Sequence, residues 1–155
     1  MNVSDILSPA DVICGMKTSS KKKLLTDLAA LAASRLGLDA GPVFEALWER
    51  EKLGSTGVGR GIAIPHGRMP HLSRIAGLFV RLQTPVAYEA IDDTPVDLVF
   101  LLLTPADAGA DHLKALARIS RLLRNAGTCE RLRAAPNADA LYSVLTEPPA
   151  GSQAA

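Results

Sequence analysis

The stretch IAGLFVRLQTPVAYEAIDDTPVDLVFLLLT, from Ile75 to Thr104, decides the fold class. Its first part alternates in hydropathy, which predicts a strand with one apolar side formed by Leu78, Val80 and Leu82. Its last part, VDLVFLLLT, is a continuous apolar run with β-branched and aromatic residues, typical of a strand that is covered on both faces. The link between them carries two prolines and an acidic pair, which predicts a short strand and a turn.

Segments with helical periodicity flank these strands along the chain. Two precede them: one starts at a Ser19 or Ser20 cap and ends at Gly37, and the second covers residues 41–54. Three follow, at residues 105–125, 129–135 and 137–147. In the longest we expect a buried stripe of Leu113, Leu116, Ser120 and Leu123. The order of elements predicts an α/β single domain, a mixed β-sheet sandwiched by helices.

The composition fits one globular domain. The chain has 155 residues, of which 48% are hydrophobic and 21% charged, so it can bury a core without disulfides or metal. We expect residues 1–147 to form the domain and residues 148–155, PPAGSQAA, to be a disordered tail. The net charge of +1 and the few aromatic residues give no support for nucleic acid binding.

Cysteine usage and hydropathy indicate a cytoplasmic protein. Cys14 and Cys129 are far apart and form no CxxC motif, so we interpret both as free thiols in a reducing compartment. At the N-terminus the lysines follow the apolar residues, which is not the order of a signal peptide. The longest strongly apolar run, at residues 98–103, is too short to cross a bilayer, so we expect no membrane insertion.

The segment GSTGVGRGIAIPHGR, from Gly54 to Arg68, is rich in glycine around one histidine. Such glycines allow the backbone to approach a ligand and to direct several N–H groups at it, which suits negatively charged oxygens. The candidate residues for binding such a group are Ser55, Thr56, Gly57 and Gly67. The alternative is that the glycines only form tight turns between a helix and a strand. The spacing matches neither of the common nucleotide-binding loops.

His66 follows the apolar IAIP segment and favours a chemical role for this loop. A neutral imidazole is a competent nucleophile near pH 7, and the simplest covalent chemistry for it here is phosphoryl transfer. Arg50, at the end of the preceding helix, is a candidate cation for the phosphoryl oxygens. His112, in the first turn of the long helix, is a candidate additional donor. Taken singly, Arg50 and His112 also fit exposed surface residues.

Two other chemistries are poorly supported. Zinc would need His66, His71 and His112 together, but no two of them have the i,i+4 spacing that aligns ligands on a helix, and no cysteine is near. A serine hydrolase lacks its GxSxG turn. We therefore expect no metal and no cofactor.

The segment REKLGSTGVGRGIAIPHGR, from Arg50 to Arg68, resembles the phosphorylation site of the enzyme IIA components of the bacterial phosphotransferase system. The similarity is to the mannitol/fructose/nitrogen class, nearest to its nitrogen-regulatory branch, and extends from ILSPADVI to ALYSVLTE. It implies that His66 accepts a phosphoryl group from a carrier protein of the HPr type, and that Arg50 and His112 help to bind that group. Arg60 stands where a small polar residue such as Asn is equally expected, and an added cation there would adjust contact with the carrier or the phosphoryl group.

The resemblance leaves two functions to weigh. The GSTGVG variant is similar to the regulatory branch, in which phosphorylation of His66 selects partner proteins, such as transporters or sensor kinases, in nitrogen, potassium or carbon regulation. The alternative is a sugar-specific enzyme IIA that passes phosphate to an enzyme IIB. A scaffold that has lost phosphoryl transfer is disfavoured because Arg50, His66 and His112 are all present.

Overall fold

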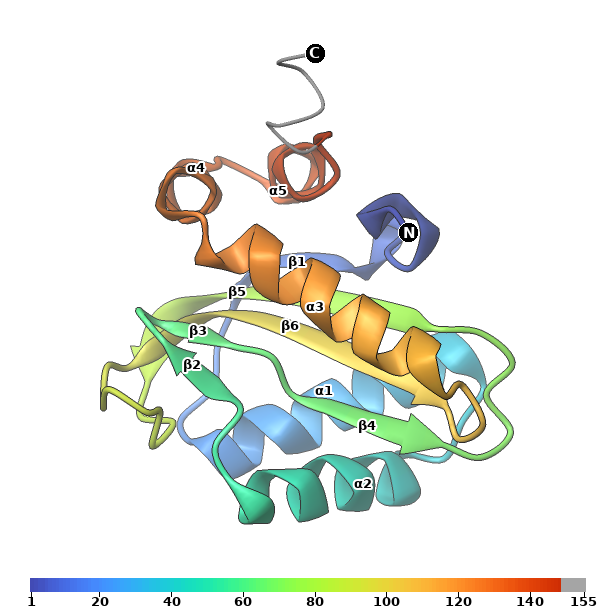
Figure 1. Ribbon diagram of the computed structural model, residues 1–155. Coiled ribbons are helices and arrows are strands. Elements are labelled where there is room, and N and C mark those ends of the chain that lie inside the picture. The colour runs from blue at the N-terminus through green and yellow to red at the C-terminus, as the bar shows by residue number, and fades with distance from the viewer. Residues whose placement is uncertain (149–155) are drawn as a thin grey trace.

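A mixed six-stranded sheet lies at the centre of the molecule, between two layers of helices (Figure 1). The computed structural model describes residues 1–148. The strands run in the order β1-β5-β6-β3-β2, and β4 also pairs with β6. β1 is parallel to β5, β5 is antiparallel to β6, and both β3 and β4 are parallel to β6. Their bounds are β1 (Val12–Met16), β2 (Gly57–Gly59), β3 (Ile62–Ala63), β4 (His66–Met69), β5 (Ala76–Val86) and β6 (Val96–Pro105).

The helices divide between the two faces of the sheet: α1 and α2 cover one, and α3, α4 and α5 cover the other (Figure 1). This confirms the predicted α/β sandwich. In the described part of the chain, no helix combines the length and the apolar character needed to cross a membrane. The helix bounds are α1 (Lys21–Leu36), α2 (Ala40–Leu53), α3 (Ala110–Arg124), α4 (Ala126–Ala134) and α5 (Ala138–Leu145).

Each face of the sheet has its own apolar core. Leu78, Val80 and Leu82 of β5 all belong to the core under α1 and α2, as their alternation predicted. Phe79, between them, belongs to the core under α3, α4 and α5. In β6 the residues from 98 to 104 are all buried, which confirms the prediction of a strand covered on both faces.

The predicted helix ends are confirmed where capping residues signalled them. Ser20 is the N-cap of α1 and its hydroxyl accepts a hydrogen bond from the Lys23 N–H at 3.1 Å. Gly37 follows α1 with φ of 70°, a conformation that favours glycine. Asn137 caps α5 through a 2.9 Å bond from the Ala140 N–H.

The buried side of α3 differs from the prediction. It consists of His112, Ala115, Ile119 and Leu123, whereas Leu113 is 66% exposed. Both sets have helical spacing, so periodicity alone could not choose between them. Packing against the sheet buries the row of α3 that contains Ala115 and His112, and His112 has a polar partner on β6.

The short strands β1, β2 and β4 were not predicted. Each is only three to five residues long, and each depends on pairing with a strand that is distant in the sequence or paired in an irregular register. His66 therefore opens β4 and does not simply follow a strand. β3 ends before Pro65, which has no N–H for the ladder, although its carbonyl accepts from Leu102. Apart from Pro148, the tail expected at residues 148–155 lies outside the described residues.

Candidate functional site

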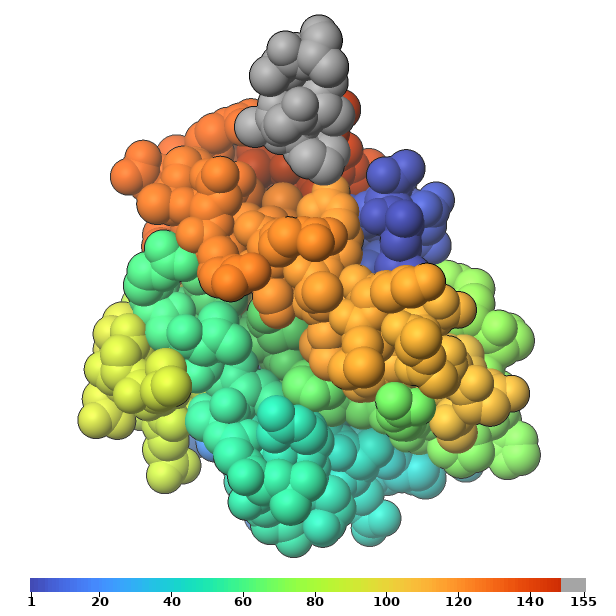
Figure 2. Space-filling view, in the orientation of Figure 1, coloured from blue at the N-terminus to red at the C-terminus, as the bar shows by residue number. Residues whose placement is uncertain are grey.

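His66 lies where the two helical layers approach the same edge of the sheet. β4 runs between α2 and α3 (Figure 1), and its atoms are visible between those two helices in the space-filling view (Figure 2). Gly67 explains the close approach of α2, because a Cβ at this position would lie 3.3 Å from the Ala46 Cβ. Alternation along β4 then directs His66 and Arg68 away from α2 and toward α3.

Hydrogen bonds make the two ring nitrogens of His66 different. Nδ1 lies 2.9 Å from the carbonyl oxygen of Ile64, which can only accept, so Nδ1 carries the proton. Nε2 is then the nitrogen with a lone pair, and the Arg50 Nε–H donates to it at 3.2 Å. Arg50 also donates from Nη1 to the carbonyl of Gly54 at 2.8 Å. The interpretation of Arg50 as an uninvolved surface residue is therefore wrong.

His112 completes a pair of imidazoles. Its ring centroid lies 5.8 Å from that of His66, with the planes tilted by 55°. The residue is only 7% exposed, so its interpretation as a solvated surface histidine is wrong. Nδ1 of His112 lies 2.6 Å from the hydroxyl of Thr104, which is fully buried. Thr104 was missed in the sequence, where the signal was a polar residue at the end of an apolar strand.

Both imidazoles are held in the neutral form. Burial lowers the pKa of His66 below 6.5 and the Arg50 guanidinium adds to this effect, while the hydrogen bond to Ile64 and the Glu51 carboxylate oppose it. Burial also lowers the pKa of His112, with further contributions from Arg68 and His66. Neutral rings at pH 7 leave the Nε2 lone pair of His66 available.

Two further arginines lie in or near this region. Arg68 is exposed, shares a face of β4 with His66, and is a cation that acts on His112, although sequence analysis did not single it out. Arg60 is directed elsewhere: its Nη2 donates at 2.8 Å to the carbonyl of Arg124, at the end of α3 opposite to His112. An arginine at that end complements the helix dipole.

Of the remaining candidate residues, Ser55 and Thr56 lie in the loop after α2, Gly57 opens β2 and Gly67 lies in β4. The N–H and the hydroxyl of Thr56 both donate to the Glu51 carboxylate, at 2.7 to 3.1 Å. The Gly57 N–H donates to the Ser55 hydroxyl oxygen at 3.1 Å. A phosphoryl-binding role for Ser55, Thr56, Gly57 and Gly67 stays a prediction, and for Thr56 it would require release from Glu51.

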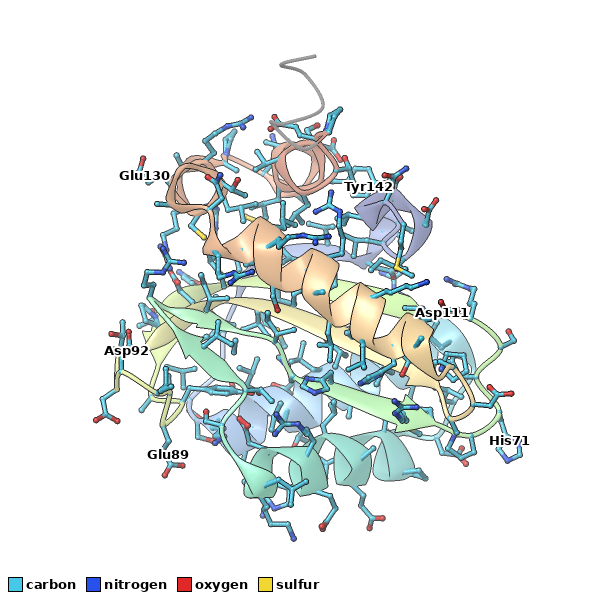
Figure 3. All side chains as sticks on the ribbon, in the orientation of Figure 1. His71, Glu89, Asp92, Asp111, Glu130 and Tyr142 are labelled. Atoms are coloured by element: carbon cyan, nitrogen blue, oxygen red, sulfur yellow. The ribbon has the colours of Figure 1, made fainter. Side chains whose placement is uncertain are left out.

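His71 is not brought to the other two histidines. It lies in the loop after β4 and points away from the molecule (Figure 3). Within residues 1–148, no group of three or more His, Cys, Asp or Glu side chains is placed to hold a metal ion. Cys14 and Cys129 are both free thiols.

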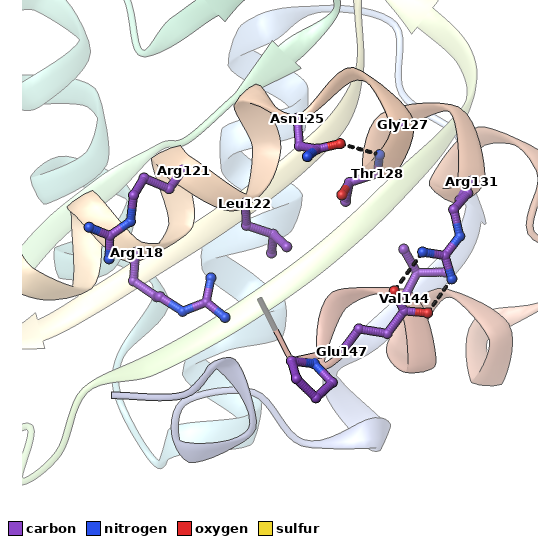
Figure 4. Close-up of a pocket in the computed structure, with 10 residues that line it drawn as sticks. Arg118, Arg121, Leu122, Asn125, Gly127, Thr128, Arg131, Val144 and Glu147 are labelled. Carbon is purple, nitrogen blue, oxygen red and sulfur yellow. Dashed lines mark hydrogen bonds and ion pairs between the residues drawn. The ribbon is translucent and has the colours of Figure 1, made fainter. Parts of the chain in front are cut away.

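A groove of about 530 Å³ lies apart from the histidine pair, between α3, α4 and α5 (Figure 4). Arg131 forms a two-pronged ion pair with Glu147 at its rim. Leu122 and Val144 give it apolar walls. Since neither Arg50, His66 nor His112 lines it, the groove is not part of the candidate site.

The site combines a neutral imidazole nitrogen, an adjacent guanidinium and a second imidazole. This arrangement suits acceptance of a phosphoryl group, since it offers one nucleophile and compensation for the charge on the oxygens. Carried on a mixed α/β sandwich, it defines a phosphotransferase component.

The chain belongs to the EIIA 2 family of the phosphoenolpyruvate-dependent sugar phosphotransferase system, whose profile matches residues 5–147. It is 54% identical over 150 residues to the nitrogen regulatory protein of Bradyrhizobium diazoefficiens, covering 97% of this chain and 98% of the relative. A crystal structure of nitrogen regulatory protein IIA-Ntr from Neisseria meningitidis superposes with a TM-score of 0.88 at 36% identity, covering 93% and 99% of the two chains.

A further relative has a different name. The fructose-specific EIIA component of Haloferax volcanii is 35% identical over 153 residues, covering 95% of this chain and 98% of the relative. The resemblance to the enzyme IIA family, with its nearest similarity to the nitrogen-regulatory branch, is confirmed by these comparisons.

Proposed function

We propose that this protein is a histidine phosphocarrier, which accepts a phosphoryl group on His66 from an HPr-like carrier protein and regulates partner proteins according to its phosphorylation state. One observation carries the proposal: His66 Nδ1 is fixed by the Ile64 carbonyl, and Nε2 lies beside the Arg50 guanidinium. This leaves one defined nucleophilic atom next to the cation that its product would need.

The reaction follows from that geometry. The Nε2 lone pair attacks phosphorus in line, a new N–P bond forms, and the N–P bond of the carrier phosphohistidine breaks with its electron pair returning to the carrier ring. The proton of His66 stays on Nδ1 and is donated to the Ile64 carbonyl oxygen, and this hydrogen bond stabilises positive charge developing on the ring. Arg50 turns its N–H groups from Nε2 to the phosphoryl oxygens, and His112 adds a donor. These groups supply the charge compensation without a metal or cofactor.

Similarity to nitrogen regulatory proteins supports the regulatory part of the proposal. Phosphorylation adds about two negative charges to a surface that now carries Arg50 and Arg68, which changes the partners it fits. Transporters and sensor kinases of nitrogen, potassium or carbon regulation are the proposed partner classes. The free thiols of Cys14 and Cys129 support a cytoplasmic location for the proposed carrier.

Labelling by a phosphorylated carrier tests the proposal. With labelled phosphoenolpyruvate and the upstream carriers, we expect an acid-labile, base-stable phosphoramidate on the wild type and none on His66→Ala. We expect Arg50→Ala and His112→Ala to label at roughly one hundredth to one tenth of the wild-type rate. Normal labelling of His66→Ala would refute the proposal. Binding of candidate partners with and without the phosphoryl group then tests regulation.

A second candidate is a sugar-specific enzyme IIA that passes its phosphoryl group to an enzyme IIB. The fructose-specific relative favours it. Transfer of label from His66 to an enzyme IIB and onward to a sugar would support this function over the regulatory one. Partner binding that depends on phosphorylation, without onward transfer, would support regulation.

A further inference from the structure

Glu51 is a buried carboxylate next to the candidate site that the chemistry above does not use. Its side chain is 3% exposed, although acidic side chains are rarely buried unless they are paired. Its two oxygens accept four contacts from Thr56, and Lys21 Nζ lies 3.3 Å from one of them. The Tyr88 hydroxyl, 3.0 Å from the Thr56 hydroxyl oxygen, completes the network.

These contacts connect Glu51 to His66 through the loop. Thr56 lies two residues after Gly54, so fixing the Thr56 N–H to Glu51 also fixes the direction of the Gly54 carbonyl. That carbonyl accepts from Arg50 Nη1 at 2.8 Å, while Arg50 Nε donates to His66 Nε2 at 3.2 Å. Arg50 and Glu51 are consecutive in the last turn of α2, so one helix end presents the cation and anchors the loop that holds it.

We propose that Glu51 is a positioning residue for phosphoryl transfer: through Thr56 it holds the loop at residues 54–56 so that Arg50 is directed at His66. This rests on the proposed function of His66. Charge balance also favours Glu51 at this position. Lys21 balances the carboxylate, so the network holds the loop without an uncompensated anion beside the incoming phosphoryl group.

The network also acts on His66 electrostatically. The Glu51 carboxylate raises the pKa of His66 against the larger lowering by burial, and so keeps Nε2 more basic than burial alone would leave it. Burial and the Glu51 charge raise the pKa of Tyr88, which therefore stays protonated and donates to Thr56. Thr56 is then free to donate its own hydroxyl hydrogen to Glu51.

Single-turnover labelling over a range of phosphorylated carrier concentrations tests this role, with Glu51→Gln and Glu51→Ala as the variants. We expect both to slow labelling of His66 by about tenfold or more, because Arg50 loses its fixed direction, while the carrier KM changes by less than about twofold. We also expect titration of His66 by NMR to give a changed pKa in Glu51→Gln, because both the Glu51 carboxylate and the Arg50 guanidinium act on that ring.

The control is Glu49→Gln, on the same turn of α2, which removes an exposed carboxylate that pairs with Lys52. It should leave both the labelling rate and the His66 pKa unchanged. If both Glu51 variants fail to fold, Thr56→Val decides, since it removes one donor to Glu51 and should slow labelling about threefold. Labelling within about twofold of wild type in the folded variants would overturn the proposal. Failure of wild type and Glu49→Gln to label would instead count against the proposed function.

Discussion

At the scale of single residues, the site depends on which nitrogen of each histidine is occupied. Nδ1 of His66 is hydrogen-bonded to the backbone carbonyl of Ile64, and Nδ1 of His112 is hydrogen-bonded to the hydroxyl of Thr104. In both rings Nε2 is the nitrogen not occupied by this contact, and the ring centroids are 5.8 Å apart. A histidine in a sequence has two equivalent candidate nitrogens, and only its neighbours in space distinguish them.

Thr104→Val tests this arrangement. The substitution keeps the shape but leaves the buried Nδ1 of His112 without its 2.6 Å partner. We expect the free energy of unfolding to fall by about 1 to 3 kcal/mol and phosphoryl transfer to slow several-fold, because the ring loses its fixed orientation. Urea denaturation and single-turnover labelling measure the two effects. Thr104→Ser keeps the hydroxyl and should stay close to wild type, so an equal loss in both variants would contradict the explanation.

At the scale of elements, long regular segments were predictable and short ones were not. β5 and β6 carry their own apolar patterns, and α1 and α5 carry their own caps, so local sequence was sufficient. β2 and β4 gain their conformation from pairing with β3 and β6, and their sequences GVG and HGRM have no strand pattern. The stripe on α3 was misplaced for a related reason, since helical spacing permits more than one face.

Gly57→Ala tests the packing of β2. A Cβ at this position would lie 2.7 Å from the Ala90 Cβ and 3.0 Å from the Ala90 Cα, so β2 would have to shift. We expect the free energy of unfolding to fall by about 1 to 3 kcal/mol, measured by urea denaturation. Gly41→Ala in α2 is the control, because a Cβ there meets nothing within 4 Å. It should change the free energy of unfolding by less than about 1 kcal/mol, because the helical preference of alanine is opposed by the following Pro42. Equal effects at the two sites would contradict the packing argument.

At the scale of the whole molecule, the site exists because two helical layers meet at one sheet edge. Arg50 comes from α2 on one face, His112 from α3 on the other, and His66 from β4 between them (Figure 1). No single layer contains the site. Its burial is consequently a property of the assembled fold, and so are the lowered pKa values of both histidines.

Stability should therefore depend on pH through this pair. The unfolded chain takes up protons on His66 and His112 as the pH falls below 6.5, whereas the folded protein resists protonation because both folded pKa values are lowered. Stability is thus full above pH 6.5 and falls below it. Urea midpoints from about pH 7.5 to about pH 5 measure the loss. The double variant His66→Gln/His112→Gln should show a smaller decline, and an unchanged decline would assign it to other groups.

The sequence by itself determined the fold class and the family, and it singled out Arg50, His66 and His112 as candidates, because these follow from apolar periodicity and from one continuous motif with a helix after it. It did not indicate that Thr104, Arg68 or Glu51 lies in or next to the candidate site. Thr104 is separated from its histidine partner by the turn into α3, and Glu51 is distinguished from Glu49 only by burial. Only the tertiary structure decided which polar groups face one another, since hydrogen bonds and burial depend on positions in space that periodicity along the chain does not specify.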